Sequence, residues 1–377
     1  MRFLHISDLH LGKRFYGISF LPYQEIITKK IINFISEKEI DAVIVAGDIY
    51  DKPVPSIEAV TLFDNFLKKI SEKNVYAFII SGNHDSPERL QFGSSFMKNS
   101  NIYIASVLQP EIQKVTLKDE YGNINIYMLP FFKCSTVNSL FAGANYPDLN
   151  SALSAVIKNN PVNTDERNIL IYHGFVFYNN KSPEISDSEL GGIQLVDAEI
   201  FNDFDYTALG HIHKPQWVKK NKIRYSGCFM KYSFSEYNQE KALTVIDLKE
   251  KGNLNTEIIP VSCECDMRIL KGYFDDIIKD AVYSEDLIRA ELADDNKVPF
   301  AVEKLRQFYP NLLELVYLSE TRSVISNGDA SIVQPEKKSL SQLMYSFYKS
   351  VYDYDISENT EEMELIEKIC RKEESNI

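Results

Sequence analysis

Five short apolar segments of this sequence each end in a group of glycine, histidine, asparagine or aspartate residues. The clearest is the run 76–80, which is too short for a globular helix and is flanked by turn residues, so we predict a buried strand. Residues 82–85, Gly-Asn-His-Asp, then lie on the loop that leaves this strand, where open α/β sheets bind ligands. These polar groups are costly to bury without partners, and metal ions or phosphate would be natural ones.

Short apolar runs alternate with segments of helical periodicity early in the chain, which favours a layered α/β domain. Helices are expected at about 23–37 and, with Ser56 as N-cap, from residue 57 onward. Strands are expected at 2–7, 42–46, 76–80, 124–129, 169–172, 206–209, 223–226 and 242–247. The last two of these strands are predicted to form an antiparallel pair that closes the domain.

The pattern divides the chain into four parts. Residues 1–260 are predicted to form the main domain, and residues 261–320 alternate strand and helix as a small βαβαβ unit. Residues 321–338 are rich in polar and turn-forming residues and are interpreted as a linker. Residues 339–377 are predicted to be a helical segment.

The helical segment carries an apolar stripe at helical spacing. Its members are Leu340, Leu343, Met344, Phe347, Tyr348 and Val351. Such a stripe more often packs on its own domain. Here it follows a polar linker and has little chain left to pack against, which favours a helix that docks on a partner.

The composition restricts the classes of partner and compartment. The 377 residues have a formal net charge of −13, which disfavours nonspecific binding to nucleic acid or to an anionic membrane. Residues 1–260 hold 30 acidic and 27 basic residues, so most of the negative charge falls on residues 261–377. Five cysteines without a C-x-x-C pair predict neither a disulfide framework nor a zinc ribbon, which fits a reducing cytoplasm. No apolar run approaches the length of a membrane span.

The side chains able to bind metal lie at five expected strand exits. They are Asp8 and His10, Asp48, Asn83 and His84, His173, and His211 and His213. Only six histidines occur in the chain, and five lie at these exits, whereas His5 lies within a strand and is interpreted as a partnered core residue. Oxygen and imidazole ligands without cysteine suit Mn, Fe, Zn or Mg. Because the set exceeds the needs of one ion, we predict two ions that share the carboxylate of Asp48.

The ordered set D-x-H, G-D, G-N-H-D, H-G and G-H-x-H resembles the calcineurin-like metallophosphoesterase superfamily. The longer runs HISDLHLGK, GDIYDKPVPS, GNHDSPERL, HGFV, LGHIHKPQ and YSGCFMKYSFSE are similar to the SbcD family of nuclease subunits, which work with an SMC-like ATPase, SbcC. The resemblance implies a layered α/β-β-α metallophosphoesterase fold with two central sheets. It also implies a small α/β capping domain that binds DNA, and a helical tail.

The resemblance also implies roles for the exit residues. One metal would be held by Asp8, His10, Asp48 and His213, and the other by Asp48, Asn83, His173 and His211. The ions are expected to be Mn²⁺, with Mg²⁺, Fe²⁺ or Zn²⁺ as alternatives. His84 would stabilise developing charge or protonate the leaving oxygen. Asp51 and Asp85 would support the ligands, or would simply fix their loops.

Basic residues near the exits could contact DNA phosphates, or could be ordinary solvated surface. They are Lys13, Arg14, Lys52, Arg89 and Lys214. The sequence does not separate the two interpretations.

The leading hypothesis for function is a DNA nuclease subunit in repair, recombination and replication. The resemblance implies 3′→5′ exonuclease activity on double strands, endonuclease activity on single strands and hairpins, and ATP hydrolysis by the SbcC-like partner, which 339–377 would bind. It also implies a homodimer within a heterotetramer. The chain has no G-x-x-x-x-G-K-[ST] loop of its own. The alternatives are a free-standing phosphodiesterase or nucleotidase for small substrates, and a non-catalytic scaffold that bridges DNA and the ATPase.

Overall fold

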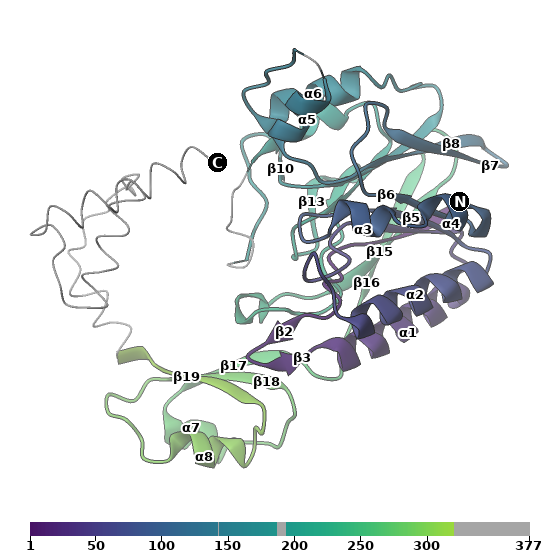
Figure 1. Cartoon of the computed structure of the whole chain (residues 1–377). Helices are drawn as coiled ribbons and strands as arrows, with labels where there is room; N and C mark the ends of the chain where they lie inside the picture. The colour runs from purple at the N-terminus through teal and green to yellow at the C-terminus, as the bar shows by residue number, and fades with distance from the viewer. Residues whose placement is uncertain (142, 187–193, 320–377) are drawn as a thin grey trace, which may run out of the picture. The chain divides into compact units, whose positions relative to one another are not determined.

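A computed structural model describes residues 1–141, 143–186 and 194–319 (Figure 1). Two six-stranded sheets form the centre of the main domain. The first sheet has the order β16 (Leu254–Pro260), β15 (Ala242–Leu248), β1 (Arg2–Ile6), β4 (Ala42–Ala46), β5 (Tyr76–Ile80) and β6 (Ile102–Ala105). Strands β1, β4, β5 and β6 are parallel, and β15 and β16 extend the sheet, with β15 antiparallel to β1 and β16 antiparallel to β15.

The second sheet has the order β13 (Gln216–Lys219), β14 (Ile223–Tyr225), β12 (Tyr206–Gly210), β9 (Arg167–His173), β8 (Gly122–Leu129) and β7 (Gln113–Asp119). Its four inner strands are parallel, and its two edge strands are antiparallel to their neighbours. The predicted strands are confirmed, but the predicted pairing of the last two is wrong. Strand β14 lies beside β12, whereas β15 lies beside β1 in the other sheet. Periodicity identifies a strand but carries no information about its neighbour.

The two sheets pack face to face around an apolar core. Phe3, Ile44 and Phe78 of the first sheet lie in one cluster with Ile126 and Ile171 of the second. Strands of parallel sheets are covered on both faces, which explains why they appear in the sequence as uninterrupted apolar runs.

Helices cover the outer face of each sheet (Figure 1). Helices α1 (Leu21–Glu37) and α2 (Ile57–Glu72) pack on the first sheet. The side chain of Ser56 caps α2 by accepting from the backbone N–H of Ala59, as predicted. Helices α5 (Cys134–Leu140) and α6 (Leu149–Lys158) pack on the second sheet. The chain therefore has the predicted α/β-β-α layering.

Shorter elements decorate these layers. They are β2 (Arg14–Phe15), β3 (Ile18–Ser19), α3 (Pro87–Gln91), α4 (Ser94–Met97), β10 (Val176–Phe177), β11 (Val196–Asp197) and short 3₁₀ helices at Lys98–Ser100, Ala198–Phe201 and Phe234–Glu236. Within the described residues, no helix is long and apolar enough to cross a membrane.

A small unit with the element order βαβαβ follows β16 in the chain. It consists of β17 (Met267–Gly272), α7 (Phe274–Lys279), β18 (Leu287–Leu292), α8 (Ala301–Arg306) and β19 (Leu312–Tyr317). Its three strands are parallel and have their own apolar cluster. Met1–Tyr317 forms one compact unit, in which Met267 and Leu287 also contact the core around α1 and α2. The predicted linker and helical segment, 321–377, lie outside the described residues.

Candidate metal centre

The five predicted exits meet at one place between the two sheets. Parallel β1, β4 and β5 bring three exits to one edge of the first sheet, and β9 and β12 bring two to the second. The backbone is unusual there. Four residues that are not glycine have positive φ: Asp8 (53°), His10 (43°), Asp48 (50°) and His211 (103°). Such conformations are costly and tend to occur at functional sites, where surrounding contacts hold them.

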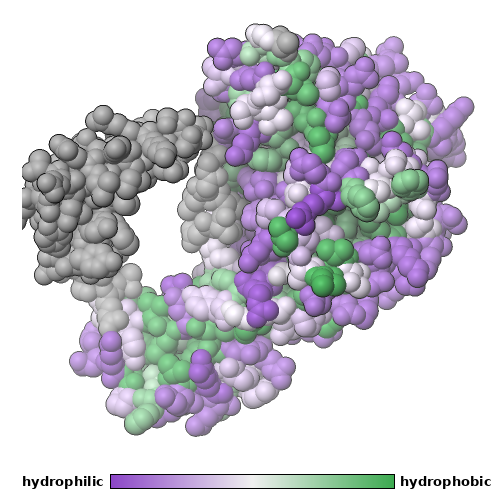
Figure 2. Space-filling model, in the orientation of Figure 1, coloured by the Kyte–Doolittle hydropathy of each residue, from purple (hydrophilic) through white to green (hydrophobic). Residues whose placement is uncertain are grey.

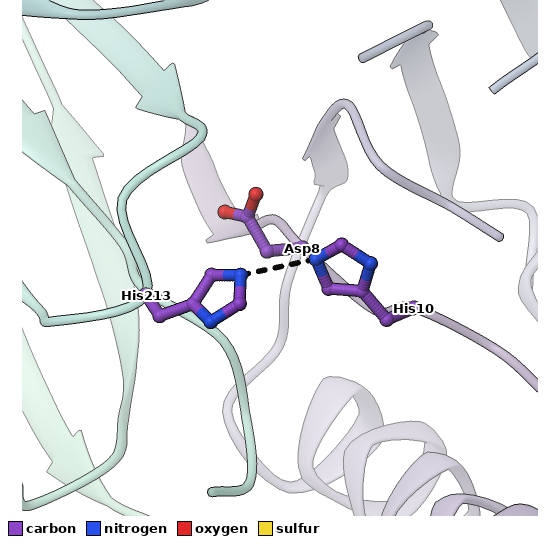
Figure 3. A group of neighbouring side chains, drawn as sticks. All are labelled: Asp8, His10 and His213. Atoms are coloured by element: carbon purple, nitrogen blue, oxygen red, sulfur yellow. Dashed lines mark hydrogen bonds between the residues drawn. The ribbon is translucent and has the colours of Figure 1, made fainter. Parts of the chain in front are cut away.

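Asp8, His10 and His213 form the first group of candidate ligands (Figure 3). All three are buried, and His10 Nε2 lies 3.0 Å from His213 Nε2. The carboxylate of Asp8 accepts from the backbone N–H of His211 at 2.9 Å and from the hydroxyl of Ser7. This group therefore joins the exit of β1 in one sheet to the exit of β12 in the other.

Asp48, His173 and His211 form the second group, together with Asn83. The amide oxygen of Asn83 lies 3.0 Å from His173 Nε2 and 2.8 Å from His211 Nδ1. His173 Nε2 is also 3.4 Å from Asp48 Oδ2. All seven residues predicted as ligands thus lie in one of two adjoining groups.

Asp48 lies between the two groups. Its Oδ2 is 3.4 Å from His173 Nε2 and 3.8 Å from His10 Nε2. Its other oxygen, Oδ1, accepts from the backbone N–H of His84 at 2.8 Å. This position suits a carboxylate that two cations share.

Charges in this site are strongly coupled. Burial opposes the charge on Asp48, but His173 and His10 outweigh it and hold the pKa of the Asp48 carboxyl well below its ordinary value. Burial opposes the charge on His173, but the charge of Asp48 and its hydrogen bond outweigh burial and raise the pKa of His173 to about 9. Burial raises the pKa of Asp8 to about 6. It lowers the pKa of His10 well below its ordinary value, and it lowers the pKa of His211 to about 3.

The donor set fits divalent cations. It combines carboxylate, amide and imidazole groups without thiolate, and its nitrogen and oxygen atoms converge from two sheets. Within the described part of the chain, His10 Nδ1 is buried without a hydrogen bond, and Asp51 Oδ1 lies 3.9 Å from it. Two imidazole Nε2 atoms at 3.0 Å face one another, which is an arrangement that a cation between them would stabilise.

His84 and Asp51 lie beside the first group. His84 Nδ1 donates to the carbonyl oxygen of Asp51 at 3.0 Å, and its ring meets that of His10 edge-on at 4.8 Å. The carboxylate of Asp51 accepts from Lys13 Nζ at 2.9 Å. The bond at Nδ1 fixes the orientation of the His84 imidazole toward the site.

Asp85 holds two exits together. Its carboxylate accepts from the backbone N–H groups of Ile49, Tyr50 and Gly82 at 2.9–3.1 Å. Burial and the neighbouring Asp48 raise the pKa of Asp85 to about 6. Asp85 therefore connects the loop after β4 to the loop after β5.

The five basic residues differ in their surroundings. Lys13 pairs with Asp51, and Lys214 pairs with Glu184. Arg14, Lys52 and Arg89 are exposed. His5, outside the site, is fully buried between Tyr206 OH at 3.0 Å and the Leu209 carbonyl oxygen at 3.1 Å, as the prediction of a partnered core residue requires.

Sequence reasoning missed a buried polar layer behind the candidate ligands. Glu236 contacts His213, and Lys241 contacts Glu236. Gln24 and Tyr232 bond one another and the backbone of the loop after β1, where the hydroxyl of Tyr232 donates to the Leu9 carbonyl. The only sequence signal was the run YSGCFMKYSFSE, which contains Tyr232 and Glu236 but lies between two strand regions without an evident role.

The chain belongs to the calcineurin-like phosphoesterase family, whose model matches residues 1–215. Family membership and the ligand groups together define a metal-dependent hydrolase that uses divalent ions.

Among individual proteins, the chain is similar to a Staphylococcus epidermidis protein described as the SbcD component of the SbcCD nuclease. The two are 29% identical over 368 residues, which is 95% of each chain. Solved structures with similarity include a Thermus thermophilus protein (12% identity, 68% of this chain and 98% of that one, TM-score 0.39). A dimetal phosphatase from Danio rerio also matches (13% identity, 69% and 99% coverage, TM-score 0.39).

Proposed function

We propose that this chain is the nuclease subunit of a DNA-processing complex and hydrolyses phosphodiester bonds with two metal ions. The observation that carries the proposal is the convergence of seven metal-binding side chains from five strand exits in a chain that matches a nuclease component along 95% of its length. We further propose that the chain acts in DNA repair, recombination and replication in the cytoplasm. The free thiols of Cys134, Cys228, Cys263 and Cys265 support a reducing compartment.

The ligands divide between two ions. Asp8, His10, Asp48 and His213 would hold one, and Asp48, Asn83, His173 and His211 the other. Bound ions, Mn²⁺ with Mg²⁺, Fe²⁺ or Zn²⁺ as alternatives, supply an activated water and neutralise phosphate charge.

His84 is the proposed catalytic residue. Because its Nδ1 donates to the Asp51 carbonyl, its Nε2 is the atom that can face the substrate. An imidazole held in this way can stabilise charge on the phosphate or give a proton to the leaving oxygen near neutral pH. Asp51 thus orients the catalytic residue, and Asp85 fixes the loop that carries it.

The substrate and partner are proposed from the SbcD-like relative. The small unit formed by β17–β19 would act as a cap over DNA, and Lys13, Arg14, Lys52, Arg89 and Lys214 would contact its phosphates. Since the sequence has no phosphate-binding loop for ATP, hydrolysis of ATP would come from an SbcC-like ATPase bound by 339–377. The complex would then act as a 3′→5′ exonuclease on double strands and as an endonuclease on single strands and hairpins.

One assay tests the proposal. The chain, alone and with the ATPase, is given linear duplex, hairpin DNA and a small phosphodiester, with Mn²⁺ or with EDTA. We expect DNA cleavage that needs Mn²⁺ and that falls about 10²-fold or more in His84→Ala, the range for loss of a general acid. Asp119→Asn, which breaks an ion pair outside the site, should retain activity. Cleavage of the small diester without cleavage of DNA would instead identify a small-substrate phosphodiesterase, and no cleavage of either would favour a scaffold.

A further inference from the structure

A buried carboxylate lies directly behind His213, on the opposite side of the ring from His10. Glu236 Oε1 is 2.8 Å from His213 Nδ1, and Glu236 is fully buried. An ionised carboxylate only accepts hydrogen bonds, so Nδ1 carries the proton. The lone pair of His213 is then on Nε2, the atom that points toward His10 in Figure 3.

Lys241 holds Glu236 in place. Its Nζ donates to Glu236 Oε2 at 2.7 Å and to the carbonyl oxygen of His213 at 3.0 Å. The backbone N–H of Tyr232 reaches the same carboxylate oxygen at 3.3 Å. The Lys241 ammonium and the Glu236 carboxylate are both buried. Separating them would leave two buried charges unpaired, which is costly, so the ion pair holds the carboxylate in position. The carboxylate is therefore a fixed support for the imidazole.

Among the described residues, no other candidate histidine ligand has a carboxylate hydrogen-bonded to its Nδ1; Asp51 Oδ1 lies 3.9 Å from His10 Nδ1, beyond hydrogen-bond distance. His173 Nδ1 contacts the backbone carbonyl of Ala46 at 2.8 Å, His10 Nδ1 has no hydrogen bond, and His211 Nδ1 faces Asn83. A carboxylate behind a ligand histidine fixes its tautomer and raises its basicity more than a neutral carbonyl does. The two groups of candidate ligands are thus unequal.

We propose that Glu236, held by Lys241, is a positioning residue that orients His213 and makes the metal position at Asp8, His10 and His213 the tighter of the two. This inference rests on the proposed two-metal function. Its consequence is ordered loading, in which the position supported by Glu236 fills first and the position at Asn83, His173 and His211 fills second.

The test is a calorimetric Mn²⁺ titration of the metal-free full chain, without DNA. Wild type should bind two ions in two classes. Glu236→Gln keeps the size of the side chain but removes its charge, and it should weaken the tighter class about 10- to 100-fold while leaving the other unchanged. Asp119→Asn is the matched control, because it breaks another ion pair of the same domain outside the site, and it should bind like wild type.

A second measurement reads the tautomer in the wild-type chain itself. Long-range ¹H–¹⁵N spectra of the histidine rings, assigned with His213→Gln, report the tautomer of His213 in the wild-type chain. A proton on Nδ1 supports the inference, and a proton on Nε2 overturns it. Equal weakening of both Mn²⁺ classes in Glu236→Gln, or no weakening, also overturns it. Failure of DNA cleavage with the two classes intact would instead refute only the proposed nuclease function.

Discussion

Gly82 lies against Asp48, where a larger residue does not fit. A Cβ at this position would lie 2.1 Å from Asp48 Oδ1 and 2.4 Å from the Asp48 backbone nitrogen. The Asp48 carboxylate would have to move away from both ligand groups. We therefore expect Gly82→Ala to weaken Mn²⁺ binding by about 10-fold or more, and to destabilise the fold by about 1–3 kcal/mol through overpacking.

Gly252→Ala separates this effect from general destabilisation. Gly252 has φ +83° and open space around it, so its substitution strains the backbone without moving a ligand. A calorimetric Mn²⁺ titration and thermal unfolding of both variants check the prediction. If Gly82→Ala binds Mn²⁺ like Gly252→Ala, Asp48 does not have the proposed role.

The chemistry of single residues decided what could be predicted from the sequence. Burying carboxylate and imidazole groups without partners is energetically costly, so their presence at strand exits indicates a bound partner. Asp8, Asp48 and His173 were therefore identifiable as candidate ligands. The role of Glu236 was not identifiable. It depends on a contact with His213, 23 positions earlier in the chain, that only the packing of the loops creates.

Among the elements, strands were predictable but their neighbours were not. Buried runs such as β4 and β5 have the predicted bounds, because burial on both faces leaves a continuous apolar signal. β14 and β15 follow one another in sequence but complete different sheets. Their partners are chosen by tertiary packing, which a pattern along one strand does not contain.

The ends of both sheets are joined by one ion-pair cluster. Arg167 of β9 donates to Asp119 of β7 at 3.1 Å, and the N-terminal ammonium of Met1 donates to the same carboxylate at 3.0 Å. Partial burial opposes ionisation of Asp119, but these bonds outweigh it and lower the pKa of Asp119 from 3.8 to about 2. A lowered pKa means that the cluster stabilises the fold above about pH 4 and loses this effect as the pH falls toward 2.

Asp119→Asn should therefore reduce the free energy of unfolding at pH 7 by about 2 kcal/mol, since it weakens bonds to a buried guanidinium. Wild type and variant should converge in stability as the pH is lowered from about 4 to about 2. Urea unfolding at several pH values measures both effects. A stability difference that stays constant over this pH range would contradict the assignment to the Asp119 charge.

At the scale of the whole molecule, apolar side chains are exposed outside the metal centre. Ile57 of α2, Phe92 after α3 and Phe96 of α4 are 82%, 86% and 79% exposed. Figure 2 shows apolar groups on the face that carries these helices. Contiguous patches of exposed apolar side chains usually mark an interface. They support the expectation, drawn from the family resemblance, of a homodimer within a heterotetramer.

Phe96→Glu should therefore convert the chain from dimer to monomer, because a dimer interface is self-complementary and the new charge would be buried on both sides of it. Light scattering after size-exclusion chromatography should give twice the 43.3 kDa chain mass for wild type and the single mass for the variant. Phe300→Glu provides the control, since Phe300 is 73% exposed but lies in the small unit. A wild-type monomer, or a Phe96→Glu dimer, would assign these exposed side chains to another partner.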